Sequence, residues 1–134
     1  MINTKRMLLA FVAAYVVSYL YEFVVFGMLL QSFHAQFPTW LKPQDQLPLL
    51  RMALTLALNI ALVTVFYCLF ARNRASNVVT GLVFGFFLGM IAGWVPQAFN
   101  KLLLNNYPFY TVWAPAIFFE VLLVGATLGL VYRE

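Results

Sequence analysis

The stretch "GLVFGFFLGMIAGWVP", residues 81–96, combines a hydrophobic composition with a glycine at every fourth position. The glycines are Gly81, Gly85, Gly89 and Gly93. Residues four apart on an α-helix lie nearly above one another, so these glycines are expected to form one groove. Such a groove lets a second backbone approach closely, which is how helices associate in lipid. The sequence therefore predicts a membrane-spanning helix with a packing groove, not a phosphate-binding loop.

The sequence alone leaves open which helix fills the groove. The segment "GATLG" carries a shorter version, Gly125 and Gly129, so the last apolar segment of the same chain is one candidate. A second copy or another subunit is the second possibility. A pore lining or hinge is the third, with a kink at Pro96, although nothing polar shares the glycine face before Gln97.

The composition indicates an integral membrane protein. The 134 residues are 64% hydrophobic and 9% charged, whereas soluble domains are about half apolar and a quarter charged. Helices are expected because lipid cannot satisfy free backbone groups. The net charge of +4 comes from cations placed singly or in pairs at segment ends, a pattern typical of membrane topology rather than of a nucleic-acid-binding surface.

Four apolar segments are long enough, at about 1.5 Å per residue, to cross a hydrocarbon core of about 30 Å. They cover residues 7–30, 49–71, 77–99 and 109–132. We expect them to form a single transmembrane domain, an all-α four-helix bundle. Proline-rich or polar connections separate them, at residues 31–48, 72–76 and 100–108.

Charge and aromatic side chains predict the orientation. Excess Lys and Arg marks the cytoplasmic side, so both termini are expected there, with Lys5, Arg6, Arg72, Arg74 and Arg133. The opposite side carries fewer cations, namely Lys42, Arg51 and Lys101, with Asp45 beside them. Aromatic residues near this outer boundary are expected to anchor at the headgroups rather than to stack on a ligand: Trp40, Trp94, Tyr107, Tyr110 and Trp113.

Two glutamates interrupt the apolar segments. Glu22 lies in "YEFVVFG" and Glu120 in "FEVLLVG". Their positions correspond to about 22 Å from the inner edge and about 16 Å from the outer edge, so they reach similar depths. Asn59 reaches a comparable depth on the second span, and Arg51 lies nearer the outer surface. These four residues are the predicted intramembrane polar cluster.

A charged carboxylate inside a membrane usually faces the protein interior and pairs. Three roles stay open for the glutamates. In the first role they are neutral carboxyl groups that join helices by hydrogen bonds to Asn59, Tyr19 or Tyr21. In the second, one of them pairs with a cation, either Arg51 or a cationic group of a partner. In the third, they conduct protons or cations. Metal ligation is disfavoured, because the Glu-x-x-His helical spacing of carboxylate metal sites is absent.

Catalytic signatures are absent from the sequence. It contains no Walker-type loop, HEXXH, GXSXG or CXXC motif. One histidine, His34, cannot provide bis-histidine haem ligation, and the one cysteine, Cys68, lies within an apolar run. We therefore expect no enzymatic activity, no metal and no cofactor.

The chain resembles small four-helix bacterial integral membrane proteins of uncharacterised families. The resemblance lies in the glycine motif followed by a proline, "GLVFGFFLGMIAGWVP", and in the glycine-containing closing segment, "GATLG". The resemblance implies a bacterial cytoplasmic membrane and no particular activity. The leading expectation is a non-enzymatic subunit or assembly partner in contact with lipid and with other membrane helices, in a homo-oligomer or a hetero-complex. The alternatives are an oligomeric transporter or proton-coupled channel that uses the glutamates, and a lipid-binding protein whose loop "FPTWLKP" lies in the interface.

Overall fold

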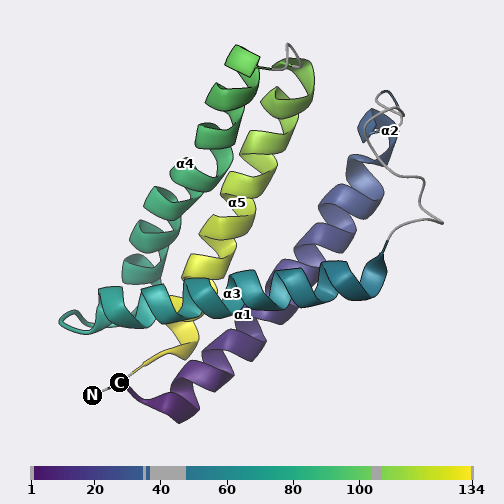
Figure 1. Ribbon diagram of the computed structural model, residues 1–134. Coiled ribbons are helices and arrows are strands. Elements are labelled where there is room, and N and C mark those ends of the chain that lie inside the picture. The colour runs from purple at the N-terminus through teal and green to yellow at the C-terminus, as the bar shows by residue number, and fades with distance from the viewer. Residues whose placement is uncertain (1, 35, 37–47, 104–106, 134) are drawn as a thin grey trace.

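The computed structural model describes residues 2–34, 36, 48–103 and 107–133, and these residues form helices without any strand. The elements along the chain (Figure 1) are α1 (Thr4–Val24), η1 (Val25–Leu29), α2 (Gln31–His34), α3 (Leu49–Ala71), α4 (Val78–Leu103) and α5 (Tyr107–Val131). Four segments are long and apolar enough to cross a membrane: Thr4–Leu29, Leu49–Ala71, Val78–Pro96 and Thr111–Val131. The prediction of an all-helical fold with four helices long and apolar enough to cross a membrane is confirmed for the described residues.

Local chemistry explains where the helices begin. The side chain of Asn3 accepts a hydrogen bond from the backbone N–H of Arg6 at 3.2 Å, so α1 starts at Thr4, three residues before the predicted span. The helix α5 starts at Tyr107, because Pro108 is tolerated in a first turn, where its missing N–H has no intrahelical partner. The helix α4 continues through Pro96, beyond the predicted end of its span.

The first span ends in a wider helical turn. In η1 the backbone N–H of Leu30 donates to the carbonyl oxygen of Val25 at 2.8 Å, the i to i+5 bond of a π-helix. Side chains after Val24 therefore point in different directions from those that a continued α-helix would give.

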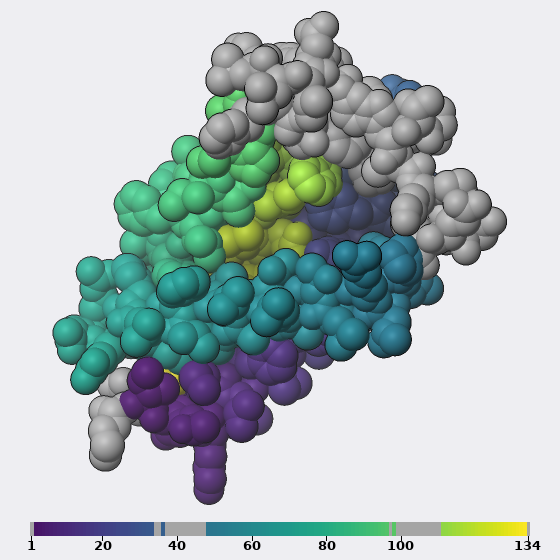
Figure 2. Space-filling view, in the orientation of Figure 1, coloured from purple at the N-terminus to yellow at the C-terminus, as the bar shows by residue number. Residues whose placement is uncertain are grey.

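The helix α5 occupies the centre of the fold. It packs most extensively against α4, and α1 covers another of its sides. The helix α3 lies mainly against α1, which it crosses in Figure 1, and touches α4 and α5 far less. In the space-filling view α5 is recessed between α4 and α3 (Figure 2).

The N-terminal end of α4 and the C-terminal end of α5 meet through glycines. A Cβ atom added to Gly81 would lie 3.0 Å from Cα of Gly129, and one added to Gly125 would lie 2.8 Å from Cα of Gly85. Added Cβ atoms at Gly81 and Gly125 would also collide with each other's backbone segments. The two backbones are therefore in direct contact here, at a separation that no other residue type permits.

The same contact continues toward the other end of the helix pair. A Cβ atom on Gly89 would lie 3.1 Å from the carbonyl oxygen of Phe118, and one on Gly93 would lie 2.7 Å from that of Ala114. All four glycines of the 81–93 motif thus face the α5 backbone, and α5 of the same chain fills their groove.

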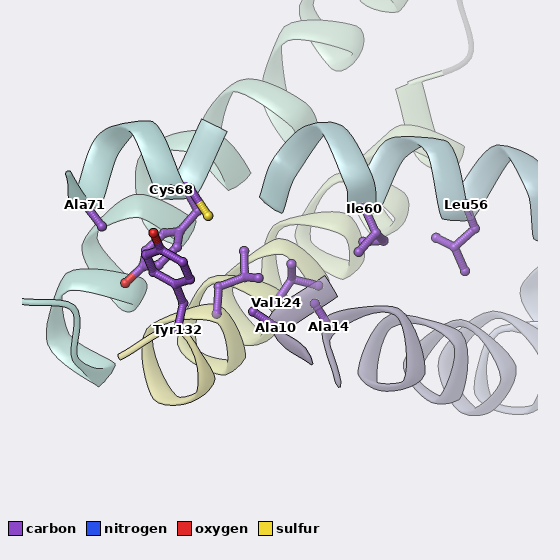
Figure 3. Close-up of a cluster of buried hydrophobic side chains, with 10 residues drawn as sticks. Ala10, Ala14, Leu56, Ile60, Cys68, Ala71, Val124 and Tyr132 are labelled. Atoms are coloured by element: carbon purple, nitrogen blue, oxygen red, sulfur yellow. The ribbon is translucent and has the colours of Figure 1, made fainter. Parts of the chain in front are cut away.

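The hydrophobic core lies between α1, α3 and α5. In Figure 3, Leu56 and Ile60 point from α3 toward α1, and Val124 of α5 lies near Ala10 and Ala14. The two alanines are completely buried, and their small side chains allow α3 and α5 to approach α1. The remaining core residues are Tyr67, Cys68, Ala71, Leu128 and Tyr132.

Aromatic contacts attach the C-terminal end of α3 to the α4–α5 pair. The ring of Tyr67 lies 5.2 Å from that of Phe84 on α4 and 6.2 Å from that of Tyr132, which follows α5. The Tyr67 hydroxyl also shares a 2.8 Å hydrogen bond with Ser76. The end of α3 nearest α4 is therefore fixed.

Candidate functional site

A row of residues on α1 builds the first part of the site. Ala10, Ala14, Ser18 and Glu22 follow at four-residue intervals, so they share one side of the helix. Ser18 is fully buried, and its hydroxyl donates a hydrogen bond to Oε1 of Glu120 on α5. Because Glu120 itself is only 9% exposed, this bond joins α1 and α5 inside the apolar interior.

Glu22 extends this connection. Its half-buried carboxyl group lies within hydrogen-bonding range of the Glu120 carboxyl. Two ionised carboxylates in contact repel strongly where water is scarce. The two groups are therefore expected to hold at least one proton and to carry at most one negative charge between them. We call Glu22 and Glu120 the carboxyl pair.

Tyr21 binds α5 beside the carboxyl pair. Its hydroxyl donates to the carbonyl oxygen of Ala116 at 2.6 Å. Its ring lies 6.4 Å from that of Phe26, which in turn lies 6.3 Å from the ring of Trp113. These contacts fix the C-terminal part of the first span against α5, and so position Glu22.

A pocket of about 350 Å³ opens between α1 and the N-terminal half of α3. Glu22 contributes the α1 side. The rest of the lining comes from α3 and the residue before it: Pro48, Arg51, Met52, Thr55, Leu56 and Asn59. Among these, the exposed polar residues Arg51, Thr55 and Asn59 are spaced by four, so they form one polar row along α3.

Two members of the polar row make no side-chain hydrogen bond to the residues that the structure describes. The Thr55 hydroxyl donates to the backbone carbonyl of Arg51 at 2.8 Å and is satisfied within its own helix. Within the described residues, the Arg51 guanidinium and the Asn59 amide make no hydrogen bond, and Arg51 forms no ion pair with Glu22 although both line the pocket. The pocket thus holds opposite charges that do not neutralise each other.

The structure divides the predicted polar cluster into two parts. Glu22 and Glu120 form the carboxyl pair, whereas Arg51 and Asn59 share the pocket with Glu22 alone. Tyr21, one of the three partners suggested for the glutamates, donates its hydroxyl to a backbone carbonyl instead.

Ser18 was missed as a glutamate partner. The sequence feature that could have indicated it is the four-residue spacing of Ala10, Ala14 and Ser18. This spacing gives α1 a row of small residues that ends at Glu22, and such rows are typical of helix contacts in membranes.

The predicted interface aromatics are only partly described. Trp94 on α4 is exposed, with its ring 5.4 Å from that of Phe118. Trp113 is half-buried against Phe26. Tyr107 and Tyr110 lie near the start of α5, and their side chains are outside the described residues. The same holds for the His34 side chain, for Trp40 and for most of the loop "FPTWLKP".

No known protein family, curated protein or solved structure matches this chain. Within the part of the chain that the structure describes, no three His, Cys, Asp or Glu side chains gather as metal ligands would. The chemistry on offer is a carboxyl pair, a guanidinium group and an amide, placed at the junction of α1, α3 and α5.

Proposed function

We propose that this chain is a non-enzymatic small subunit or assembly partner of a larger membrane complex. The observation that carries the proposal is the exposed polar row of α3 beside Glu22. Ionisable side chains are costly against lipid, and amide side chains within spans form hydrogen bonds across helices. A protein partner over this face would supply the polar contacts that the described residues do not make.

The polar residues of this face lie at different depths along α3. Arg51 lies within one turn of the start of α3, so its long side chain can extend to the headgroup region. Asn59 is ten residues after Leu49, about 15 Å along the helix and near the middle of a core of about 30 Å. Its short side chain cannot extend to the headgroup region from that depth as Arg51 can, so Asn59 is the residue that most needs a partner.

The glycine groove, which was one candidate for the partner surface, is filled by α5. The geometry therefore favours the pocket side of α1 and α3 for the partner. We define the partner face by Glu22 and the polar row Arg51, Thr55 and Asn59.

We further propose that both termini lie in the cytoplasm and that the membrane is the bacterial inner membrane. The support is the charge asymmetry, because Arg72 and Arg74 lie in the short α3–α4 connection, on the same side as Lys5 and Arg6.

Purification from native membranes in mild detergent tests the proposed function. We expect the chain to elute in a complex larger than one copy, and Asn59→Leu to release it from that complex. The control Leu54→Ala changes an exposed α3 side chain that does not line the pocket, and should leave the complex intact. Elution as a lone monomer at several mild detergent concentrations would contradict the proposal.

A second candidate is an oligomeric proton- or cation-coupled transporter or channel. The carboxyl pair favours it, because Glu22 lines the open pocket while Glu120 lies buried behind it. Beyond Glu120, the α5 row continues with the buried apolar residues Val124 and Leu128, which separate the pair from the other end of the fold.

Flux measurements in liposomes distinguish this candidate from the first. Proton or cation flux above that of empty liposomes, lowered in both Glu22→Gln and Glu120→Gln, would support transport. Thr127→Ala is the matched control, because that hydroxyl bonds only within its own helix, to the Leu123 carbonyl at 2.8 Å. Equal flux in the wild type and both glutamate variants would exclude the carboxyl pair from any pathway.

A further inference from the structure

We infer that the partner on the partner face is a second copy of this chain, related to the first by a two-fold axis. The inference rests on the proposed function, since it identifies the occupant of the same face. It follows from the distribution of charge and hydrogen-bonding groups on that face.

The partner face carries both signs of charge. Glu22 and Arg51 line one pocket without pairing with each other. In a two-fold dimer the same patch lies on both sides of the interface, so residue i of one copy meets residue j of the other, and the reverse. A face with one carboxylate and one guanidinium is therefore complementary to itself, and two equivalent Glu22–Arg51 pairs form between the copies.

The charges of the carboxyl pair and of Arg51 from the second copy also balance. With one shared proton, Glu22 and Glu120 carry a single negative charge between them. One guanidinium from the second copy neutralises that charge. The buried end of the pair remains held by the Ser18 hydroxyl.

Asn59 gives the same face a self-complementary polar group. An amide both donates and accepts hydrogen bonds, so it can pair with an identical amide. Two α3 helices related by a two-fold axis along the membrane normal run in the same direction, and Asn59 of one copy then lies at the same depth as Asn59 of the other. A lipid headgroup can bind Arg51, but it does not reach an amide about 15 Å into the span.

Two reciprocal charge variants provide the test. Arg51→Glu gives a face with two carboxylates, and Glu22→Arg gives a face with two guanidinium groups. Each variant is expected to repel its own copy and to attract the other variant, because both intermolecular pairs are opposite in charge only in the mixed dimer. Recovery cannot arise within one chain, since neither variant carries both signs at positions 22 and 51.

The measurement is co-purification of two differently tagged full-length copies expressed together. We expect wild-type copies to co-purify, each variant to lose self-association by about tenfold or more, and the mixed pair to recover most of it. Recovery also shows that both variant chains fold. Arg133→Glu, at the opposite end of the fold from the pocket, is the control and should self-associate like the wild type.

Self-association of either variant at the wild-type level would overturn the inference, and so would a mixed pair that fails to recover. If wild-type copies do not co-purify but a different membrane protein is retained and is lost on Asn59→Leu, the inference fails while the proposed function stands. If neither a second copy nor another protein is retained, both fail.

Discussion

The hydrogen bond between Ser18 and Glu120 joins α1 to α5 at a depth where water does not compete for either group. Because Ser18 is completely buried, removing its hydroxyl leaves a carboxyl oxygen without its donor. The bond therefore contributes to helix association, although hydrogen bonds within membranes contribute modestly on average.

Ser18→Ala is expected to lower the free energy of unfolding by about 0.5 to 2 kcal/mol. Thermal unfolding in detergent, followed by circular dichroism, measures the change. Thr127→Ala removes a hydroxyl that bonds only to Leu123 of its own helix, so it should alter the midpoint much less. A Ser18→Ala midpoint equal to that of the wild type would show that the Ser18–Glu120 bond contributes nothing to stability.

Sequence reasoning located the glutamates more readily than their partners. Carboxylates inside apolar segments are conspicuous, and depth along each span placed Glu22 and Glu120 near each other. The partner choice depends on helix rotation and on the order of neighbours around α5, which no spacing within one helix specifies. For this reason Ser18 was missed, and Tyr21, one of three suggested partners of the glutamates, bonds instead to the Ala116 carbonyl.

The close contact between α4 and α5 depends on α4 carrying a glycine, which has no side chain, at each of four positions that face α5. The four-residue spacing of glycines predicted the groove from sequence, because it follows from helix geometry alone. The identity of the helix in the groove did not follow, since a glycine row accepts any close backbone. The structure supplies it, with Gly125 and Gly129 meeting Gly81 and Gly85.

Gly81→Ala is expected to destabilise the α4–α5 pair, because the added Cβ collides with the Gly125 backbone. Overpacking of this kind typically costs about 1 to 3 kcal/mol, more than the gain of about 1 kcal/mol in helix propensity. Gly27→Ala is the matched control, since its nearest neighbour would be the Glu22 carbonyl oxygen at 4.0 Å. Unfolding midpoints compare the two, and a Gly81→Ala midpoint as high as that of Gly27→Ala would contradict the close contact.

Considered as a whole, the molecule is asymmetric in its polar surface. Large apolar side chains are exposed on all four long helices, as expected where lipid is the solvent. The polar row of α3 is an exception within the spans, and it lies beside Glu22, which lines the same pocket. This asymmetry is the physical reason for assigning one side of the protein to a protein partner and the rest to lipid.

The proposed orientation gives a labelling prediction. Cys68 is fully buried and should not react in the folded protein, so single cysteines can be introduced at exposed positions. We expect Asn73→Cys, in the α3–α4 connection, to react only with a membrane-permeant reagent in intact cells. Gln36→Cys, after α2, should react with an impermeant reagent. The opposite pattern would reverse the topology.

The most direct test of the partner face is photo-cross-linking in native membranes from position 55. Thr55 is exposed in the polar row and bonds only to its own helix, so a photo-reactive residue there leaves Glu22, Arg51 and Asn59 intact. The control position is Phe87, an exposed residue of α4. We predict a protein adduct of about twice the 15.3 kDa chain mass from position 55 and only lipid adducts from position 87. Lipid adducts alone from both positions would contradict a protein partner on this face.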